Sequence, residues 1–145
     1  MVVGSKVLAT GIFDLLHIGH VYFLNQAKKL GDHLTVLITC DRVASSQKRK
    51  PIYNESERKK LIDSLKVVDA SIIGNESVDY CRTLNELQPD ILALGFDQDF
   101  QIRNKLKNCH WNGKIVRVGK YPNKTQSTTN IIRKVSQSLK LKSQN

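Results

Sequence analysis

Short apolar runs alternate along the chain with segments whose apolar residues recur at helical spacing. The apolar runs have the length of β-strands and are rich in Val, Ile and Leu, as expected of strands buried in a parallel sheet. They cover residues 6–10, 34–39, 68–73, 91–94 and 115–118. Helices are expected over residues 20–30, 78–87, 101–107 and 127–139, and a further helix begins at 54. This alternation predicts an α/β fold in three layers around a five-stranded parallel sheet.

Several helix boundaries can be predicted from single residues. Asn54 followed by Glu57 forms a capping-box pattern at the start of a helix. Gly31 is predicted to end the helix over 20–30 as a C-terminal cap. The segment 45–51 has no apolar periodicity and ends in a proline, which predicts a loop. The polar tail 140–145 is predicted to be frayed.

Polar and glycine-rich segments follow four of the predicted strands. Parallel strands place their carboxyl ends at one edge of the sheet, where ligands bind in such folds. The segments that we expect to meet there cover residues 11–20, 41–50, 95–97 and 119–128. The sequence therefore predicts one binding site assembled from four places in the chain.

Length and composition favour a single domain spanning residues 1–145, without a membrane span or a signal peptide. The three cysteines are odd in number and lack a Cys-x-x-Cys spacing, which argues against a disulfide framework and a zinc site. A reducing cytoplasm is the expected location. Cys40, at a strand end, is predicted to be buried and inert. The formal net charge of +10 favours anionic partners, although a basic surface can also serve solubility alone.

The segment 11–20 places His17 and His20 where a strand gives way to a helix. A helix start has unpaired backbone N–H groups and a partial positive charge, so it binds anions readily. Two imidazoles at this point can also donate hydrogen bonds to phosphate oxygens. A lone histidine is more often structural, but His-x-Gly-His at a strand-to-helix turn favours phosphate chemistry.

This segment resembles the signature of the cytidylyltransferase-like nucleotidylyltransferases, whose fold is Rossmann-like. The resemblance extends over nearly the whole chain. Residues 94–98 (Leu-Gly-Phe-Asp-Gln) are similar to a block of archaeal-type FAD synthases, and residues 127–129 (Ser-Thr-Thr) to one of glycerol-3-phosphate cytidylyltransferase. Residues 48–52 and 57–59 look like the family's basic loop and arginine-bearing helix. Ile12 departs from the pattern, because the family commonly has threonine there.

The resemblance implies attack by an acceptor phosphate on the α-phosphate of a nucleoside triphosphate. Such a nucleophile is already anionic near pH 7, so the site must position groups and neutralise charge rather than remove a proton. We expect His17, His20 and Lys50 to be catalytic, with His20 nearest the transition state. The expected nucleotide-binding residues are Ile12, Phe13, His17, Gly19, His20, Lys48, Arg58, Asp97, Tyr121, Ser127 and Thr128. A divalent metal ion, Mg²⁺, is expected to bridge the phosphates, and Asp14 is its candidate protein ligand.

Each of these residues also has a structural alternative. The run 48–50 can be a solvated charged face, and Asp97 can be a turn residue. Ser127 and Thr128 can serve as a helix N-cap, a role compatible with phosphate binding. Asp14 can orient His17 or cap the turn instead of binding metal. Phe96 and Trp111 can stack on a flavin ring or pack in the core or on the surface.

The leading hypothesis is transfer of AMP from ATP to FMN, giving FAD and pyrophosphate. It depends on residues 49–52 and 97–98. Residues 127–129 favour the alternative of transfer from CTP to glycerol 3-phosphate, and another phosphorylated small molecule can be the acceptor. A remote alternative is a non-catalytic basic module that binds nucleic acid, but the chain lacks the aromatic-interleaved basic pattern of RNA-binding strands. Family resemblance also suggests a homodimer.

Overall fold

All strands of the sheet run parallel, as the sequence predicts. The computed structural model describes residues 4–47, 49–77, 79–98, 102–122 and 127–144. The sheet has five strands in the order β3-β2-β1-β4-β5. Their bounds are β1 (Lys6–Gly11), β2 (His33–Ile38), β3 (Ala70–Ile73), β4 (Ile91–Leu94) and β5 (Lys114–Arg117). The predicted α/β, Rossmann-like fold class is confirmed.

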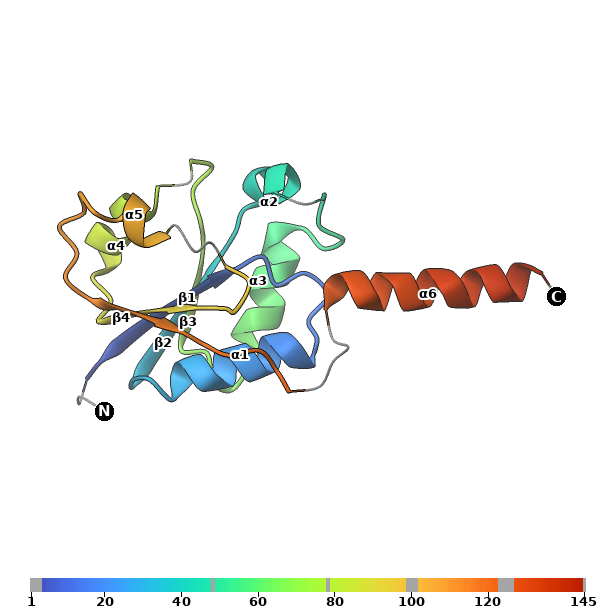
Figure 1. Cartoon of the computed structure of the whole chain (residues 1–145), viewed down its shortest axis with the longest axis horizontal. Coiled ribbons are helices and arrows are strands. Elements are labelled where there is room, and N and C mark those ends of the chain that lie inside the picture. The colour runs from blue at the N-terminus through green and yellow to red at the C-terminus, as the bar shows by residue number, and fades with distance from the viewer. Residues whose placement is uncertain (1–3, 48, 78, 99–101, 123–126, 145) are drawn as a thin grey trace.

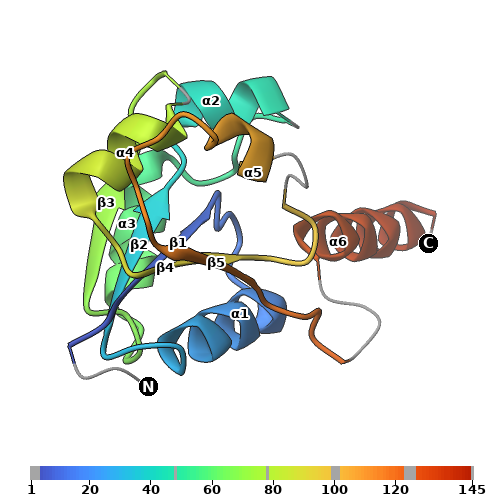
Figure 2. The same ribbon diagram turned by 60° about the vertical axis from the view of Figure 1, so that its left-hand side comes forward.

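Helices cover both faces of this sheet (Figures 1 and 2). Their bounds are α1 (Ile18–Lys28), α2 (Asp41–Gln47), α3 (Glu55–Asp63), α4 (Tyr80–Leu87), α5 (Ile102–Lys105) and α6 (Thr128–Ser143). Helices α1 and α3 lie on one face, and α4 and α5 lie on the other. The strand order reverses between β1 and β4, which are neighbours but not consecutive. A crevice is expected at the carboxyl ends of these two strands.

The core consists of two clusters, one on each face of the sheet. Alternate residues of a strand point to opposite faces, so Val7 and Ala9 enter one cluster and Leu8 enters the other. The first cluster packs against Leu24 and Ala27 of α1 and Ile62 of α3. The second contains Leu8, Leu84, Leu92, Leu94, Ile102 and Leu106. Burial of apolar side chains thus holds both helix layers against the sheet, and such burial is the main favourable contribution to folding.

Two predictions about helix boundaries are wrong. Residues 45–47 belong to α2 rather than to a loop. This short helix buries only the adjacent residues Val43 and Ala44, so its sequence shows no helical periodicity. Helix α1 ends at Lys28, with Lys29 as a right-handed C-cap. Gly31 therefore does not cap it. A Cβ on Gly31 would lie 2.7 Å from Ser5 Oγ and 2.8 Å from Val7 Cγ2, so this glycine permits close packing instead.

The cysteine prediction is corrected by a disulfide between Cys81 of α4 and Cys109, which follows α5. The two residues are 28 positions apart, and only the fold brings them together. Cys40 is free and buried, as predicted. The disulfide joins α4 to the segment that follows α5, and both cysteines pack against the second core cluster.

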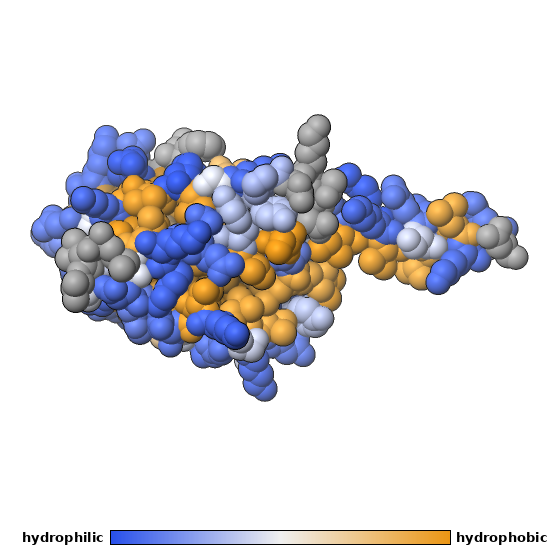
Figure 3. Space-filling model, turned by 90° about the horizontal axis from the view of Figure 1, so that it is seen from below, coloured by the Kyte–Doolittle hydropathy of each residue, from blue (hydrophilic) through white to orange (hydrophobic). Residues whose placement is uncertain are grey.

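Helix α6 projects from the body of the molecule (Figure 1). It continues to Ser143, four residues beyond the predicted end of the last helix at 139. It contains no buried residue, and Val135, Leu139 and Leu141 are exposed. Seen from the α1 side, apolar residues of α6 lie beside an apolar area of the body (Figure 3). Within the described residues, every helix is too short or too polar to span a bilayer.

Candidate active site

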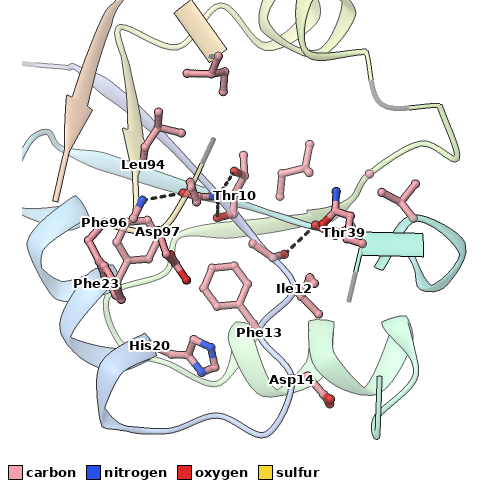
Figure 4. A pocket seen from close by; sticks show the side chains of 18 of the residues that line it. Thr10, Ile12, Phe13, Asp14, His20, Phe23, Thr39, Leu94, Phe96 and Asp97 are labelled. Carbon is pink, nitrogen blue, oxygen red and sulfur yellow. Dashed lines mark hydrogen bonds between the residues drawn. The ribbon is translucent and has the colours of Figure 1, made fainter. Parts of the chain in front are cut away.

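A cavity of about 520 Å³ opens at the carboxyl edge of the sheet (Figure 4). All four segments predicted to meet there contribute to its lining. They supply residues such as His17 and His20 after β1, Arg49 after α2, Asp97 after β4, and Tyr121, Ser127 and Thr128 after β5. The cavity is the crevice expected where the strand order reverses.

The two histidines form a mutually supporting pair at the start of α1. His17 is the N-cap, and its Nδ1 accepts a hydrogen bond from Gly19 N at 3.0 Å. The Nδ1 of His20 accepts from His17 N at 3.3 Å, and the two rings stack with centroids 3.8 Å apart. A neutral imidazole has one N–H, so an accepting Nδ1 places that proton on Nε2. Each ring therefore keeps an Nε2–H donor for an anion.

The environment of the pair keeps both rings neutral near pH 7. Burial, together with the neighbouring His17, lowers the pKa of His20 from 6.5 to about 3, although Asp14 acts in the opposite direction. Burial also lowers the pKa of His17. The ring of Phe13 meets the His20 ring edge-on, with centroids 5.5 Å apart. The neutral Nε2–H tautomers are thus favoured by both hydrogen bonding and desolvation.

This pKa shift predicts a pH-dependent stability. The folded state resists protonating His20, whereas the unfolded chain binds the proton below about pH 6.5, so unfolding becomes easier as pH falls from 6.5 to 4.5. One such proton contributes at most about 1.4 kcal/mol per pH unit. We expect a smaller loss of unfolding free energy in His20→Gln, measured by urea denaturation at pH 7 and pH 5. Equal losses in both proteins would contradict the assignment.

The turn before α1 is held in an uncommon backbone conformation. Phe13 and Leu15 have φ angles of 56° and 49°, in the left-handed region that bulky residues rarely occupy. Phe13 is buried and stacks on Phe23 of α1 with centroids 6.4 Å apart. Packing of the Phe13 ring offsets the strain of this backbone conformation. The strained turn places Ile12, Phe13 and Asp14 at the cavity wall.

Asp14 is buried and fully engaged as an acceptor. Its carboxylate accepts from the backbone N–H groups of Ile52 and Tyr53 at 2.8 and 3.0 Å and from Arg49 at 3.2 Å. Its backbone carbonyl accepts from Thr128 Oγ1 at 2.7 Å. Burial raises the pKa of Asp14, but these donors outweigh burial and hold the pKa below its ordinary value. Asp14 thus ties the basic segment and the start of α6 to the histidine turn.

These contacts do not fit the expected role of Asp14 as a metal ligand. A cation on this carboxylate would have to displace N–H donors that already surround it. Among the described residues, no cluster of three or more His, Cys, Asp or Glu side chains could hold a metal ion. Asp14 is therefore a positioning residue, which is one of the alternatives left open by the sequence.

The structure does not place Arg58 at the cavity, which corrects its predicted contact with phosphate. Its side chain is 0% exposed. The guanidinium donates to the carbonyl oxygens of Ile12 (2.7 Å), Thr39 (2.8 Å) and Tyr53 (3.1 Å) and to the Asp41 carboxylate (2.7 Å). Four fixed acceptors exclude a ligand anion. Arg58 instead holds the loops after β1 and β2 against α3, whose capping box at Asn54 and Glu57 is confirmed.

The basic segment reaches the cavity through Arg49. Lys50 is exposed and is not among the residues that line the cavity, and Lys48 lies outside the described residues. Arg49 lines the cavity while its Nη1 contacts Asp14 and the Lys50 carbonyl. Sequence reasoning passed over Arg49, although it is the middle residue of the basic run.

The segments after β4 and β5 form the wall opposite the basic segment. Asp97 and Phe96 are exposed and line the cavity, and Lys120 Nζ lies 5.3 Å from the Phe96 ring centre. Tyr121 packs edge-on against Tyr22 of α1 at 5.4 Å. Trp111 lies elsewhere, since its indole donates to the Pro89 carbonyl and packs on the second core cluster.

Gln98 fixes the position of Asp97. Its side-chain carbonyl accepts from Gly95 N at 2.6 Å, and its amide donates to both the carbonyl and the hydroxyl of Thr10 at 3.0 Å. This links the end of β4 to the end of β1. The glutamine of the Asp97-Gln98 pair is therefore structural.

The start of α6 also borders the cavity. Ser127 caps the helix by accepting from Asn130 N at 3.1 Å, and Ser127, Thr128 and Thr129 line the cavity. The N-termini of α1 and α6 thus border the same cavity, each with a partial positive charge. Together with Gly19, which leaves room beside the histidines, this arrangement suits a polyanion.

Comparison with known proteins identifies the family of this chain. The model of the cytidylyltransferase-like family matches residues 8–134. The chain belongs to the cytidylyltransferase-like family. A relative named FAD synthase from Picrophilus torridus is 41% identical over 133 residues, covering 90% of this chain and 95% of the relative. Another FAD synthase, from Methanosarcina mazei, is 45% identical over 117 residues, covering 79% of this chain and 76% of the relative.

Solved structures of other proteins share the fold. A crystal structure titled lipopolysaccharide core biosynthesis protein, from Thermoplasma volcanium, is 43% identical with a TM-score of 0.76. The matched region covers 81% of this chain and 98% of the chain in that crystal structure. A pantoate-beta-alanine ligase from Francisella tularensis, 17% identical over 82% of this chain and 60% of that one, has a TM-score of 0.58 and shares the fold.

Proposed function

We propose that the protein is an FMN adenylyltransferase, which transfers AMP from ATP to FMN to give FAD and pyrophosphate. The FAD synthase relatives that span most of the chain support the acceptor and the nucleotide. The observation that carries the reaction type is the cavity itself. Two neutral histidines with free Nε2–H donors and the N-termini of two helices border one space.

The reaction needs no general base from the protein. A phosphate oxygen of FMN attacks the α-phosphorus of ATP, a new P–O bond forms, and the bond from the α-phosphorus to the bridging oxygen breaks. The leaving pyrophosphate carries away the electron pair. The acceptor oxygen is already anionic near pH 7, so positioning and charge neutralisation supply the rate enhancement.

We assign the triphosphate to the histidine turn and the start of α6. The Nε2–H groups of His17 and His20 donate to phosphate oxygens, and His20, the more buried ring, lies against the reacting phosphate. Ser127 and Thr128 bring the α6 N-terminus to the β- and γ-phosphates. Lys50 and Lys48 add positive charge from the basic segment, beside Arg49. Asp97 and Tyr121 contact the nucleoside, and Ile12, Phe13 and Gly19 shape the backbone around it.

Nucleotidyltransferases of this kind typically use a divalent metal, and we propose Mg²⁺. Because Asp14 is occupied by N–H donors, the phosphates and water supply the ligands of the ion, as is common for nucleotide-bound Mg²⁺. Among the described residues, no group of three or more His, Cys, Asp or Glu side chains forms a cage for the ion.

The test is a product assay with four combinations of substrates. The protein is incubated with Mg²⁺, with ATP or CTP, and with FMN or glycerol 3-phosphate, and the products are identified by mass. We expect FAD and pyrophosphate from ATP and FMN. CDP-glycerol without FAD would support the alternative that residues 127–129 suggest. Salt-dependent binding of nucleic acid without any pyrophosphate release would instead favour a non-catalytic module.

A further inference from the structure

We propose that Arg117, the last residue of β5, is a positioning residue for the nucleotide, because it fixes the turn that carries Asp97. This turn covers residues 95–98 and follows β4 directly. The inference rests on the proposed function, which assigns Asp97 to the nucleoside. Arg117 is not among the residues that line the cavity, so we expect it to act through the turn rather than by contact with a substrate.

The backbone of the turn fixes Asp97 only weakly. The hydrogen bond that closes the turn, from Gln98 N to the Gly95 carbonyl, is 3.3 Å long, slightly beyond the usual range. Phe96 and Asp97, the two residues at its tip, are exposed. Exposed residues lose conformational freedom when they bind a ligand, and this loss weakens binding. Contacts that order the turn beforehand therefore strengthen binding at Asp97.

The guanidinium of Arg117 joins both ends of the turn. Its Nη1 donates to the Gly95 carbonyl and to the Gln98 carbonyl, each at 3.0 Å. Nη1 carries two N–H groups, so it can serve both acceptors at once. Hydrogen bonds from a charged donor are stronger than those between neutral groups. One side chain thus holds the first and the last residue of the turn together.

Strand pairing explains why Arg117 reaches this turn. Strands β4 and β5 are parallel neighbours, and Leu94 lies opposite Arg117 in their register. Val118 N donates to the Leu94 carbonyl at 2.7 Å, at the point where the turn begins. Because β5 is an edge strand and the Arg117 side chain is exposed, its removal leaves no cavity in the core. We therefore expect its substitution to loosen the turn without unfolding the protein.

Gln98 holds the turn from the other side of β4. Its side-chain carbonyl accepts from Gly95 N at 2.6 Å, and its amide donates to the carbonyl and the hydroxyl of Thr10 in β1 at 3.0 Å. The turn is thus attached to β1 through Gln98 and to β5 through Arg117, the two strands that flank β4. Asp97 lies between these attachments and lines the cavity (Figure 4). Its carboxylate is therefore in place before the nucleotide binds.

The experiment is a double-mutant cycle that combines Arg117→Gln with Asp97→Ala. The Kd for ATP is measured by isothermal titration calorimetry, and kcat and the KM values for ATP and FMN are measured from FAD formation. The matched control is Lys114→Gln, which removes the same charge from the other end of β5, at an exposed position that does not line the cavity. Circular dichroism checks the folding of each variant.

We expect Arg117→Gln to raise the Kd and KM for ATP about five- to tenfold, since the turn loses two charge-assisted hydrogen bonds. The KM for FMN and kcat should change less than about twofold, as expected when binding alone is weakened, and Lys114→Gln should leave all values unchanged. Asp97→Ala should itself weaken ATP binding. In that background Arg117→Gln should have no further effect, because the side chain that Arg117 positions is gone.

Two further variants examine the geometry of the contact. Arg117→Lys retains a charged donor without the planar fork, so it should recover part of the ATP affinity, and it replaces Arg117→Gln should that variant not fold. Gln98→Leu detaches the turn from β1. It should also raise the Kd for ATP, and its effect should likewise disappear in the Asp97→Ala background.

The outcomes separate this inference from the proposed function. Normal ATP affinity in folded Arg117→Gln would mean that the residue serves only the fold. An effect that persists in the Asp97→Ala background would mean that its charge acts on the triphosphate directly. Either result, or normal ATP affinity in Asp97→Ala, overturns the positioning role while FAD formation by the wild-type protein stands. If the wild-type protein neither binds ATP nor makes FAD, the proposed function fails, and the positioning role fails with it.

Discussion

Replacing His20 by alanine is expected to lower kcat for FAD formation by roughly 10²–10³-fold, the usual cost of losing one preorganised donor at the reacting group. The Nε2–H of His20 is the donor that the tautomer leaves available, since Nδ1 accepts from His17 N. The substitution also removes the acceptor for that N–H and the ring stacked on His17. Steady-state kinetics with ATP and FMN, with circular dichroism as a check on folding, measures the effect.

Two further variants make this result interpretable. His110→Ala removes an exposed imidazole that does not line the cavity, and it should leave kcat unchanged. His20→Gln keeps an N–H donor and should recover part of the lost rate. A folded His20→Ala protein with nearly normal turnover would exclude His20 from the transition state.

Arg58→Met is expected to lower the free energy of unfolding by about 3–5 kcal/mol, because several carbonyl oxygens and the Asp41 carboxylate lose their donor together. The methionine side chain can replace part of the packing volume but none of the hydrogen bonds. Chemical denaturation monitored by circular dichroism measures the loss.

The chain offers a matched control in another arginine–carboxylate pair. Arg42 contacts Glu76 at 2.8 Å, with both side chains at least 70% exposed. Exposed pairs contribute little, so Arg42→Met should cost less than about 1 kcal/mol. An Arg58→Met protein that is as stable as the wild type but binds ATP poorly would restore the phosphate role predicted from the sequence.

Arg58 shows why part of the site could not be predicted from the sequence. In the string Glu57-Arg58-Lys59 all three side chains are charged, and nothing local distinguishes the middle one. Its burial depends on carbonyl groups supplied by loops 19 and 46 positions away. The same reason explains Asp14, whose partners come from residues 49–53 and 128. The local sequence pattern predicts that Arg58 and Asp14 are important, whereas their tertiary contacts determine whether each binds a ligand or positions other residues.

The fold itself was predictable because its signals are local and repeated. Five apolar runs rich in Val, Ile and Leu alternate with helical segments. This alternation predicts strands that pair in parallel within one sheet. Helix α2 escaped prediction because a seven-residue helix with two buried residues has no periodicity to detect. The Cys81–Cys109 disulfide escaped prediction because the pairing depends on how α4 packs against the segment that follows α5.

The projecting α6 has a thermodynamic consequence for nucleotide binding. A helix of 16 residues that contains no buried residue is marginal in water, since little tertiary packing offsets the cost of nucleating its first turn. That first turn is held by the Ser127 cap and by the hydrogen bond from the Thr128 hydroxyl to the Asp14 carbonyl, at the place that we assign to the phosphates. A bound triphosphate therefore adds charge–dipole stabilisation to the nucleus of the helix, so the helix–coil equilibrium of α6 is linked to occupancy of the site.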